Sequence, residues 1–154
     1  MSPYPLCLYR YVTNKVYPKE IAEAHKNCDL HLHDLSFYGV YCCGWSIREL
    51  LEEGLGGVKN KINSGPAKHL STACQQIVNF LGVMQNECAG AQALSSFDTY
   101  LSPLIKKDNL SYEQVKQCLQ SLLFGINTPS RWGSQAPFSN VTLDFIPPDD
   151  LKDK

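Results

Sequence analysis

The stretch Tyr38–Gly54, YGVYCCGWSIRELLEEG, decides the fold that the sequence predicts. It begins as a short strand and is expected to break at Gly44 and Trp45 before a helix starts. Side chains alternate between the two faces of a strand, so Cys42 and Cys43 point to opposite sides. Only one of these two thiols can therefore face a given site.

The helix that follows has clear start and stop signals. Ser46 is a good N-cap, and Glu49 stands three residues later as the partner of a capping box. Ile47 and Leu50 begin an apolar stripe, and Gly54 is placed to end the helix. This order puts the thiol pair at the carboxyl end of a strand, which is where α/β folds bind ligands. The pair also precedes a helix N-terminus, which favours a thiolate or a bound phosphate.

Composition narrows the class of protein. The chain has 154 residues, which fits one domain or a piece of one. Its charged fraction of 19% is below the usual ~25%, which indicates either a surface that packs against something else or ordinary variation. The net charge is −1 without a basic stripe, so nucleic-acid binding has no electrostatic support.

Location is predicted from what the sequence lacks. The start, MSPYPLCLYR, has no apolar signal-peptide core, and no window approaches the ~18 apolar residues of a membrane-spanning helix. The seven cysteines form no regular framework. We therefore expect a reduced, cytoplasmic protein without a membrane partner.

The whole chain, 1–154, is expected to be a single partial domain. Residues 1–16 are predicted to be an irregular arm because Pro3 and Pro5 discourage a helix. Residues 146–154 are predicted to be a polar tail. Between them the expected order is strand, helix, long helix, helix, helix and strand, which is typical of an α/β body with helical insertions.

Two central segments suggest close packing. The long helix predicted over 66–87 is apolar on more than one side, which indicates burial in a larger body or contact with a partner subunit. Cys74 and Cys88 lie on this apolar pattern and are expected to be core thiols. The small residues of AGAQA, 89–93, would let another backbone approach closely. Ser95 or Ser96 can cap the next helix and Ser111 the one after it, and a strand is expected near 139–145.

Two polar clusters are candidate ligand sites. The first, around CDLHLHD, could be drawn as a metal site with His25, Cys28, His31 and His33, but the spacing matches no standard zinc pattern. We favour hydrogen-bonded or site-lining histidines and no metal. The second cluster precedes the last strand and suits a phosphate or ribose, although a solvated loop is equally compatible; it contains Ser130, Arg131, Gln135 and Asn140.

Several ordered blocks together resemble one family. They are AEAHKNCDLHLHDL, CGWSIRELLEEGLGG, PAKHLSTA, QIVNFLG, AGAQALSSFDTYLSP and NTPSRWGSQAPFSNVTLDF, and they extend over residues 17–145. This combination resembles the anaerobic (class III) ribonucleotide reductases of the glycyl radical superfamily. The resemblance implies an oxidoreductase built on a ten-stranded α/β barrel, of which this chain would supply about half.

The resemblance also implies roles for individual residues. In the family a glycyl radical generates a thiyl radical on a finger-loop cysteine, which removes the 3′ hydrogen of the ribose. Cys42 looks like the second cysteine, on the first barrel strand, which helps to reduce the 2′ position. Lys68 lies in a stretch that resembles part of the nucleotide effector site at the dimer interface. The helix over 66–87 would then contact the second copy of a homodimer.

The resemblance implies partners outside the chain as well. The finger-loop cysteine, the zinc-binding cysteines and the glycyl radical segment are expected in a missing C-terminal half. An activase with S-adenosylmethionine and an iron–sulfur cluster would generate the radical, and formate or protein dithiols would supply electrons. We therefore expect this chain alone to leave ribonucleoside triphosphates unreduced. The alternatives are a non-catalytic nucleotide-binding or dimerisation module and a small metal protein.

Overall fold

The computed structural model describes the chain except for residues 1–3, 36–38, 57–62, 89, 129–134 and 152–154. The chain divides into two compact units, residues 1–40 and residues 41–154. We describe each unit by itself.

The first unit is helical. Helix α1 spans Tyr4–Tyr11, the π-helix η1 spans Val12–Val16 and helix α2 spans Lys19–Lys26. The prediction of an irregular arm over residues 1–16 was therefore wrong. Pro5 falls in the first turn of α1, where proline is tolerated because the amide hydrogens there have no partner within the helix.

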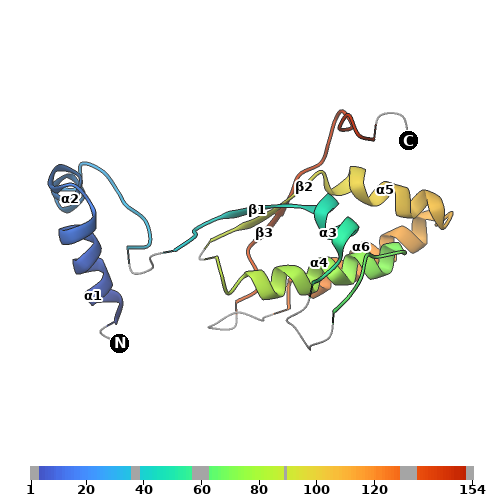
Figure 1. Cartoon of the computed structure of the whole chain (residues 1–154), viewed down its shortest axis with the longest axis horizontal. Helices are drawn as coiled ribbons and strands as arrows, with labels where there is room; N and C mark the ends of the chain where they lie inside the picture. Colours follow the sequence, from blue (N-terminus) through green and yellow to red (C-terminus); the bar gives the residue numbers. More distant parts are fainter. Residues whose placement is uncertain (1–3, 36–38, 57–62, 89, 129–134, 152–154) are drawn as a thin grey trace. The chain divides into compact units, whose positions relative to one another are not determined.

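The second unit contains a three-stranded parallel sheet in the order β1-β2-β3, whose strands lie side by side in Figure 1. The strands are β1 (Cys43–Ser46), β2 (Gln92–Ser95) and β3 (Ser139–Val141). The register aligns Gly44 of β1 with Ala93 of β2 and Asn140 of β3. The predicted α/β class is confirmed at this level, while the ten-stranded barrel stays a prediction.

Four helices complete the second unit: α3 (Ile47–Glu53), α4 (Leu70–Met84), α5 (Phe97–Lys107) and α6 (Tyr112–Ile126). Two predicted N-caps are confirmed. The Glu49 amide donates to Ser46 Oγ at 3.4 Å, and Ser111 forms a complete capping box with Gln114. Gly54 ends α3 with a φ of 76°, a conformation that glycine adopts without a Cβ clash.

The sequence misplaced two strands. Strand β1 runs through Gly44 and Trp45, which we expected to break it, and β2 was not predicted at all. Both errors have one cause, because these strands are only four residues long and are stabilised by pairing with each other and by packing on α4. Helix α4 is also shorter than the predicted 66–87, since it begins after His69.

Helix α5 continues past Pro103 to Lys107. A proline within a helix leaves the carbonyl four residues earlier without its usual donor. Here that carbonyl belongs to Thr99, and the Ser102 hydroxyl donates to it at 2.8 Å. The side chain of the preceding residue thus replaces the hydrogen bond that proline removes.

One apolar core joins the helices to the sheet. Its buried members come from α3, α4, β2, α5 and α6 and are Ile47, Leu50, Leu70, Ala73, Cys74, Ile77, Leu81, Leu94, Phe97, Leu101 and Leu122. Burial raises the pKa of the Cys74 thiol to about 11, and nearby Cys118 adds to the shift. Cys74 is therefore a core thiol, as predicted, and is protonated at neutral pH.

Gln92 is a polar residue inside this apolar region, only 1% exposed. Its Nε2 donates to the Leu81 carbonyl of α4 at 3.1 Å, and its Oε1 accepts from Trp45 Nε1 at 3.0 Å. One amide therefore connects β2 to α4 and to β1. A buried polar group with partners on both sides favours one register over its alternatives.

Within the ranges that the structure describes, no helix combines the length and the apolar character needed to cross a membrane.

We predict that Gln92→Leu lowers the free energy of unfolding by about 1–3 kcal/mol, because the Trp45 indole N–H loses its acceptor in a buried setting. Urea unfolding followed by tryptophan fluorescence measures the change. Gln120→Leu, at an exposed position on α6, is the matched control and should stay within about 0.5 kcal/mol. Equal effects of the two substitutions would contradict the role given to Gln92.

Candidate functional site

The two faces of the sheet carry different chemistry. One face packs on α4: the Trp45 ring contacts Phe80 edge-on with centroids 5.2 Å apart, and Gln92 and Leu94 are each 1% exposed. Alternation along the strands places Cys43 on this helix-facing side with Trp45. The helix-facing side is therefore largely buried, with a pocket of about 570 Å³ beside Trp45 and Phe80.

The opposite side, which we call the open face, carries Gly44, Ala93 and Asn140, and the exposed thiol of Cys42 lies just before β1. The regular register ends there, because the Gly90 amide donates to the Tyr41 carbonyl at 2.6 Å, one residue out of step with the Cys43–Gln92 pairing. Cys42 is an exposed free thiol, and Gly44 and Asn140 are exposed as well. The open face thus presents an amide beside two small residues, with a thiol at its edge.

Cys42 and Asn140 are offset both across and along the sheet. Asn140 aligns with Gly44, two residues after Cys42, and lies two strands away. Adjacent strands are about 4.8 Å apart and a strand rises about 3.3 Å per residue, so the two backbone positions are roughly 12 Å apart.

The thiols lie at the other end of the strand from the one we predicted. Cys43 is the first residue of β1, so the pair is at the amino end, while Ser46 leads from the carboxyl end into α3. The arguments from strand ends and from the helix N-terminus therefore do not apply to Cys42. Cys42 is an exposed free thiol and Cys43 is in a disulfide; that only one of the two faces a substrate site stays a prediction.

Cys43 forms a disulfide with Cys88, with the two Cα atoms 6.7 Å apart. Cys88 is buried, as predicted, but the prediction that it is a free core thiol was wrong. The 45 residues between the two cysteines hide their proximity in the sequence. Packing of α4 under the sheet brings the turn after α4 back to the start of β1.

Gly90 makes room for Cys42. A Cβ atom at Gly90 would lie 2.8 Å from Cys42 Sγ and 3.0 Å from the Tyr41 carbonyl oxygen. The close backbone approach that the small residues of 89–93 suggested is therefore confirmed at Gly90. Sequence reasoning did not connect this glycine with the thiol, because the link depends on the register of an unpredicted strand.

The four residues predicted to bind substrate have different outcomes. Ser130 and Arg131 lie outside the described residues. Gln135 is exposed and precedes β3, and Asn140 is on β3 itself. Of the four, Asn140 is the residue that the described structure places on the open face of the sheet.

Lys68, the predicted effector residue, is exposed and precedes α4. Its carbonyl accepts a hydrogen bond from Lys107 Nζ at 3.1 Å. The next residue, His69, contacts Asp108 through Nδ1 and Oδ2 at 2.8 Å. These contacts fix the backbone before α4 against the end of α5.

The histidines of the first unit form a series of ring contacts. His25 and His31 have centroids 5.9 Å apart, and His31 and His33 are 4.7 Å apart. The Leu32 amide donates to His25 Nδ1 at 3.3 Å. Within the described ranges, no three His, Cys, Asp or Glu side chains are arranged to hold a metal ion.

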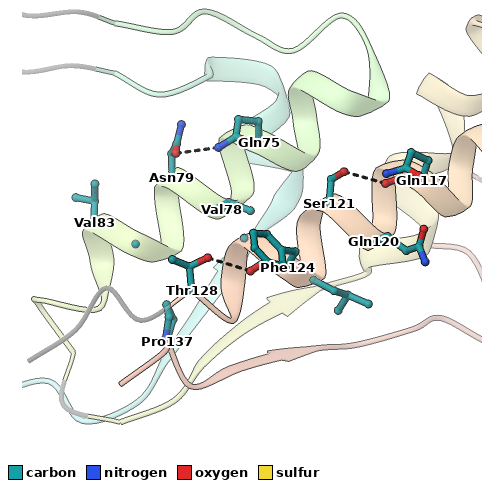
Figure 2. Close-up of a pocket in the computed structure, with 13 residues that line it drawn as sticks. Gln75, Val78, Asn79, Val83, Gln117, Gln120, Ser121, Phe124, Thr128 and Pro137 are labelled. Carbon is teal, nitrogen blue, oxygen red and sulfur yellow. Dashed lines mark hydrogen bonds between the residues drawn. The ribbon is translucent and has the colours of Figure 1, made fainter. Parts of the chain in front are cut away.

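A groove of about 1140 Å³ separates the exposed sides of α4 and α6 (Figure 2). Apolar side chains are exposed along it, with Phe124 at 79%, Val83 at 66% and Leu123 at 54%. Figure 2 shows polar groups at its edge bonded within their own helix, as in the Gln75–Asn79 pair at 3.2 Å. The groove is thus an apolar surface with internally paired polar side chains.

The segment after β3 is fastened to the helices. Thr99 Oγ1 donates to Asp144 Oδ2 at 2.8 Å, and Arg48 pairs with Asp150 at 3.2 Å. Hydrogen bonding and charge from Glu52, and then the charge of Asp150, raise the pKa of the Arg48 guanidinium. The polar tail is therefore bound to α3 and α5 at Asp150.

One family model matches almost the whole chain. It is described as anaerobic ribonucleoside-triphosphate reductase, and it matches residues 7–153. The curated relatives include the anaerobic ribonucleoside-triphosphate reductases of Escherichia coli and Haemophilus influenzae, each 23% identical over 88% of this chain. The chain spans 22% of the length of each of these two relatives.

Solved structures give the same result. The anaerobic ribonucleotide reductase from Thermotoga maritima in complex with dATP and CTP aligns with a TM-score of 0.70 and 29% identity. The alignment covers 90% of this chain and 25% of that structure's chain. The same enzyme with dATP bound in its specificity site aligns with a TM-score of 0.69.

We predict that Gly90→Ala lowers the free energy of unfolding by about 1–3 kcal/mol, because the added methyl group meets Cys42 Sγ and the Tyr41 carbonyl. Urea unfolding measures the loss. The matched control is Gly82→Ala in α4, where no heavy atom lies within 4 Å of the added Cβ. This control should be neutral or stabilising by up to about 1 kcal/mol. A neutral Gly90→Ala would show that Cys42 does not occupy the position described.

Proposed function

The chain belongs to the anaerobic ribonucleoside-triphosphate reductase family, and on that premise we propose that it is the N-terminal part of the catalytic barrel of such an enzyme. The observation that carries the proposal is the position of Cys42. It is an exposed free thiol just before β1, against Gly90, and lies at the edge of the face that carries Gly44, Ala93 and Asn140.

Cys42 would act as the reducing thiol. The radical chemistry of the family, supplied from outside residues 1–154, makes the 2′ hydroxyl of the ribose a leaving group. Cys42 then gives its thiol hydrogen to the 2′ carbon, and its sulfur pairs with a second cysteine as the product forms. Replacement of C–O by C–H at the 2′ position turns a ribonucleotide into a deoxyribonucleotide.

Asn140 would orient the sugar. An amide side chain carries both an acceptor oxygen and donor hydrogens, so it can pair with ribose hydroxyls in either direction. Ser130, Arg131 and Gln135 are proposed to bind the phosphate side of the substrate, since an arginine fork matches phosphate oxygens. Gly44 and Ala93 leave the space between Cys42 and Asn140 open.

The rest of the barrel is proposed to cover surfaces that this chain leaves exposed. Strands β1 and β3 are the two edges of the sheet. Large apolar side chains near and after β3 are exposed, including Phe138 at 71%, Leu143 at 65% and Phe145 at 105%. An open edge has unpaired backbone N–H and C=O groups, and together with exposed apolar residues it can pair with further strands.

We propose two further contacts on the helical side. The groove between α4 and α6 would hold the same groove of a second copy in a homodimer, which fits its exposed Phe124 and Val83. Lys68, held before α4, would contact the phosphate of a nucleotide effector. We also propose that an activase with an iron–sulfur cluster generates the radical and that zinc is bound in the C-terminal part of the enzyme. The proposed location is the cytoplasm.

The alternative is a nucleotide-binding or dimerisation module that has lost the chemistry. A reconstitution assay separates the two. The chain would be mixed with a C-terminal portion of the Thermotoga maritima reductase, an activase with an electron donor for its iron–sulfur cluster, S-adenosylmethionine, a ribonucleoside triphosphate, and formate or a dithiol as reductant, and deoxynucleotide would be quantified. Absence of product from every folded mixture would favour the module.

We predict that the chain alone gives no product and that the reconstituted mixture does. Cys42→Ser should reduce product to background, since a hydroxyl does not replace a thiol as a hydrogen donor in this step. Cys43→Ser is the matched control and should retain activity, because its side chain lies on the helix-facing side. Product from the chain alone, or from the Cys42→Ser mixture, would refute the assignment.

A further inference from the structure

We propose that Cys43 and Cys88 form a redox-reversible bridge that controls the reactivity of the neighbouring thiol of Cys42. The bridge joins the first residue of β1 to the link between α4 and β2. Its sulfurs belong to the helix-facing side, so the substrate chemistry proposed above does not use them. Cys43 and Cys88 would therefore have a regulatory function that is separate from the catalytic function proposed for Cys42.

The bridge holds the backbone on which Cys42 is mounted. Two backbone hydrogen bonds connect this segment to the approach to β2: Gly90 N–H to the Tyr41 carbonyl at 2.6 Å, and Cys43 N–H to the Ala91 carbonyl at 3.0 Å. The disulfide adds a covalent connection at the same place. Because the ends of strands open more readily than their centres, this connection matters most at the first residue of β1.

Opening of this segment would change the surroundings of the Cys42 thiol. Its sulfur is against Gly90, whose Cβ position is 2.8 Å away. While the bridge is closed, residues 41–43 are held against the Gly90 backbone and the thiol keeps this position. Cys42 is exposed while the bridge is closed, but its sulfur is held against Gly90. When the bridge opens, the segment can separate from β2, and the Cys42 sulfur leaves this contact and reacts faster with reagents.

The two sulfurs of the bridge differ in access. Cys88 is 3% exposed, whereas Cys43 is half-buried. An external thiol or disulfide therefore reaches the sulfur of Cys43 first. This asymmetry gives the exchange a defined order, in which Cys88 is the leaving group during reduction and the attacking group during closure.

Glutathione disulfide is a suitable oxidant for closure. The Cys43 thiolate attacks it, one glutathione leaves, and a mixed disulfide forms on Cys43. The Cys88 thiolate then attacks the Cys43 sulfur, the second glutathione leaves, and the protein disulfide closes. Two electrons pass from the two protein thiols to glutathione disulfide, and their two protons end on the two glutathione molecules. Reduction by glutathione reverses these steps.

The bridge and its effect on Cys42 do not depend on the proposed reductase function. The consequence for catalysis does, because only a reducing thiol at Cys42 would make the bridge a control on turnover. The test therefore measures the Cys43–Cys88 linkage and the reactivity of Cys42 directly. A negative result in the reconstitution assay would leave the outcome of this test unchanged.

The experiment poises the full chain in mixtures of glutathione and glutathione disulfide under anaerobic conditions. Peptide mass spectrometry quantifies the linked Cys43–Cys88 peptide, and a pulse of iodoacetamide measures the alkylation rate of Cys42. We expect the linked peptide in the oxidised mixture and a rise of at least about threefold in the Cys42 rate on reduction. Exposed Cys28, in the first unit, is an internal control with a constant rate.

Variants isolate the bridge from other effects of reduction. Cys43→Ser and Cys88→Ser should each give the faster Cys42 rate in both mixtures, while Cys118→Ser should keep the redox dependence. Circular dichroism shows that each variant is folded, and Cys43→Ser avoids a change in the buried Cys88. A missing Cys43–Cys88 peptide, a dominant Cys42–Cys88 peptide, or a Cys42 rate equal in both mixtures would overturn the proposal.

Discussion

The side-chain amide of Gln92 is the interaction on which the arrangement of the sheet depends. It accepts from the Trp45 indole in β1 and donates to the Leu81 carbonyl in α4, so it connects two strands and a helix from within the core. A shift of β2 by one residue would turn Gln92 to the open face and leave the indole without its acceptor. The pairing of Gly44 with Ala93, and of Ala93 with Asn140, follows from this register.

The register separates two kinds of cysteine chemistry. Cys42 and Cys43 are adjacent in sequence, yet one is a free exposed thiol and the other is bound to Cys88. The proposed reductase function requires a thiol that meets substrate and that holds its position. Under that proposal Cys42 is the thiol, and the disulfide of the next residue, Cys43, anchors the backbone beside it.

The sequence predicted the features that depend on local signals. The caps at Ser46 and Ser111 and the burial of Cys74 follow from residues close together in the chain, and the family resemblance follows from ordered blocks spread over residues 17–145. It failed for β2 and for the Cys43–Cys88 pair, because both depend on packing between segments about 45 residues apart. The prediction of an irregular arm over residues 1–16 was wrong for a local reason. Pro5 was taken as a helix breaker, but it lies in the first turn of α1, where proline is tolerated. Asn140 was named for its amide, but its position relative to Cys42 required the register.

The central proposal is that Cys42 and Asn140 share the open face. The most direct measurement is thiol cross-linking with a bismaleimide of about 12 Å span, matched to two strand spacings and an offset of two residues, in a chain with Cys7, Cys28 and Cys118 replaced by serine. The account predicts an intramolecular link from Cys42 to a thiol introduced by Asn140→Cys, and none to one introduced by Val141→Cys on the helix-facing side. A link at position 141 without one at position 140 would contradict it.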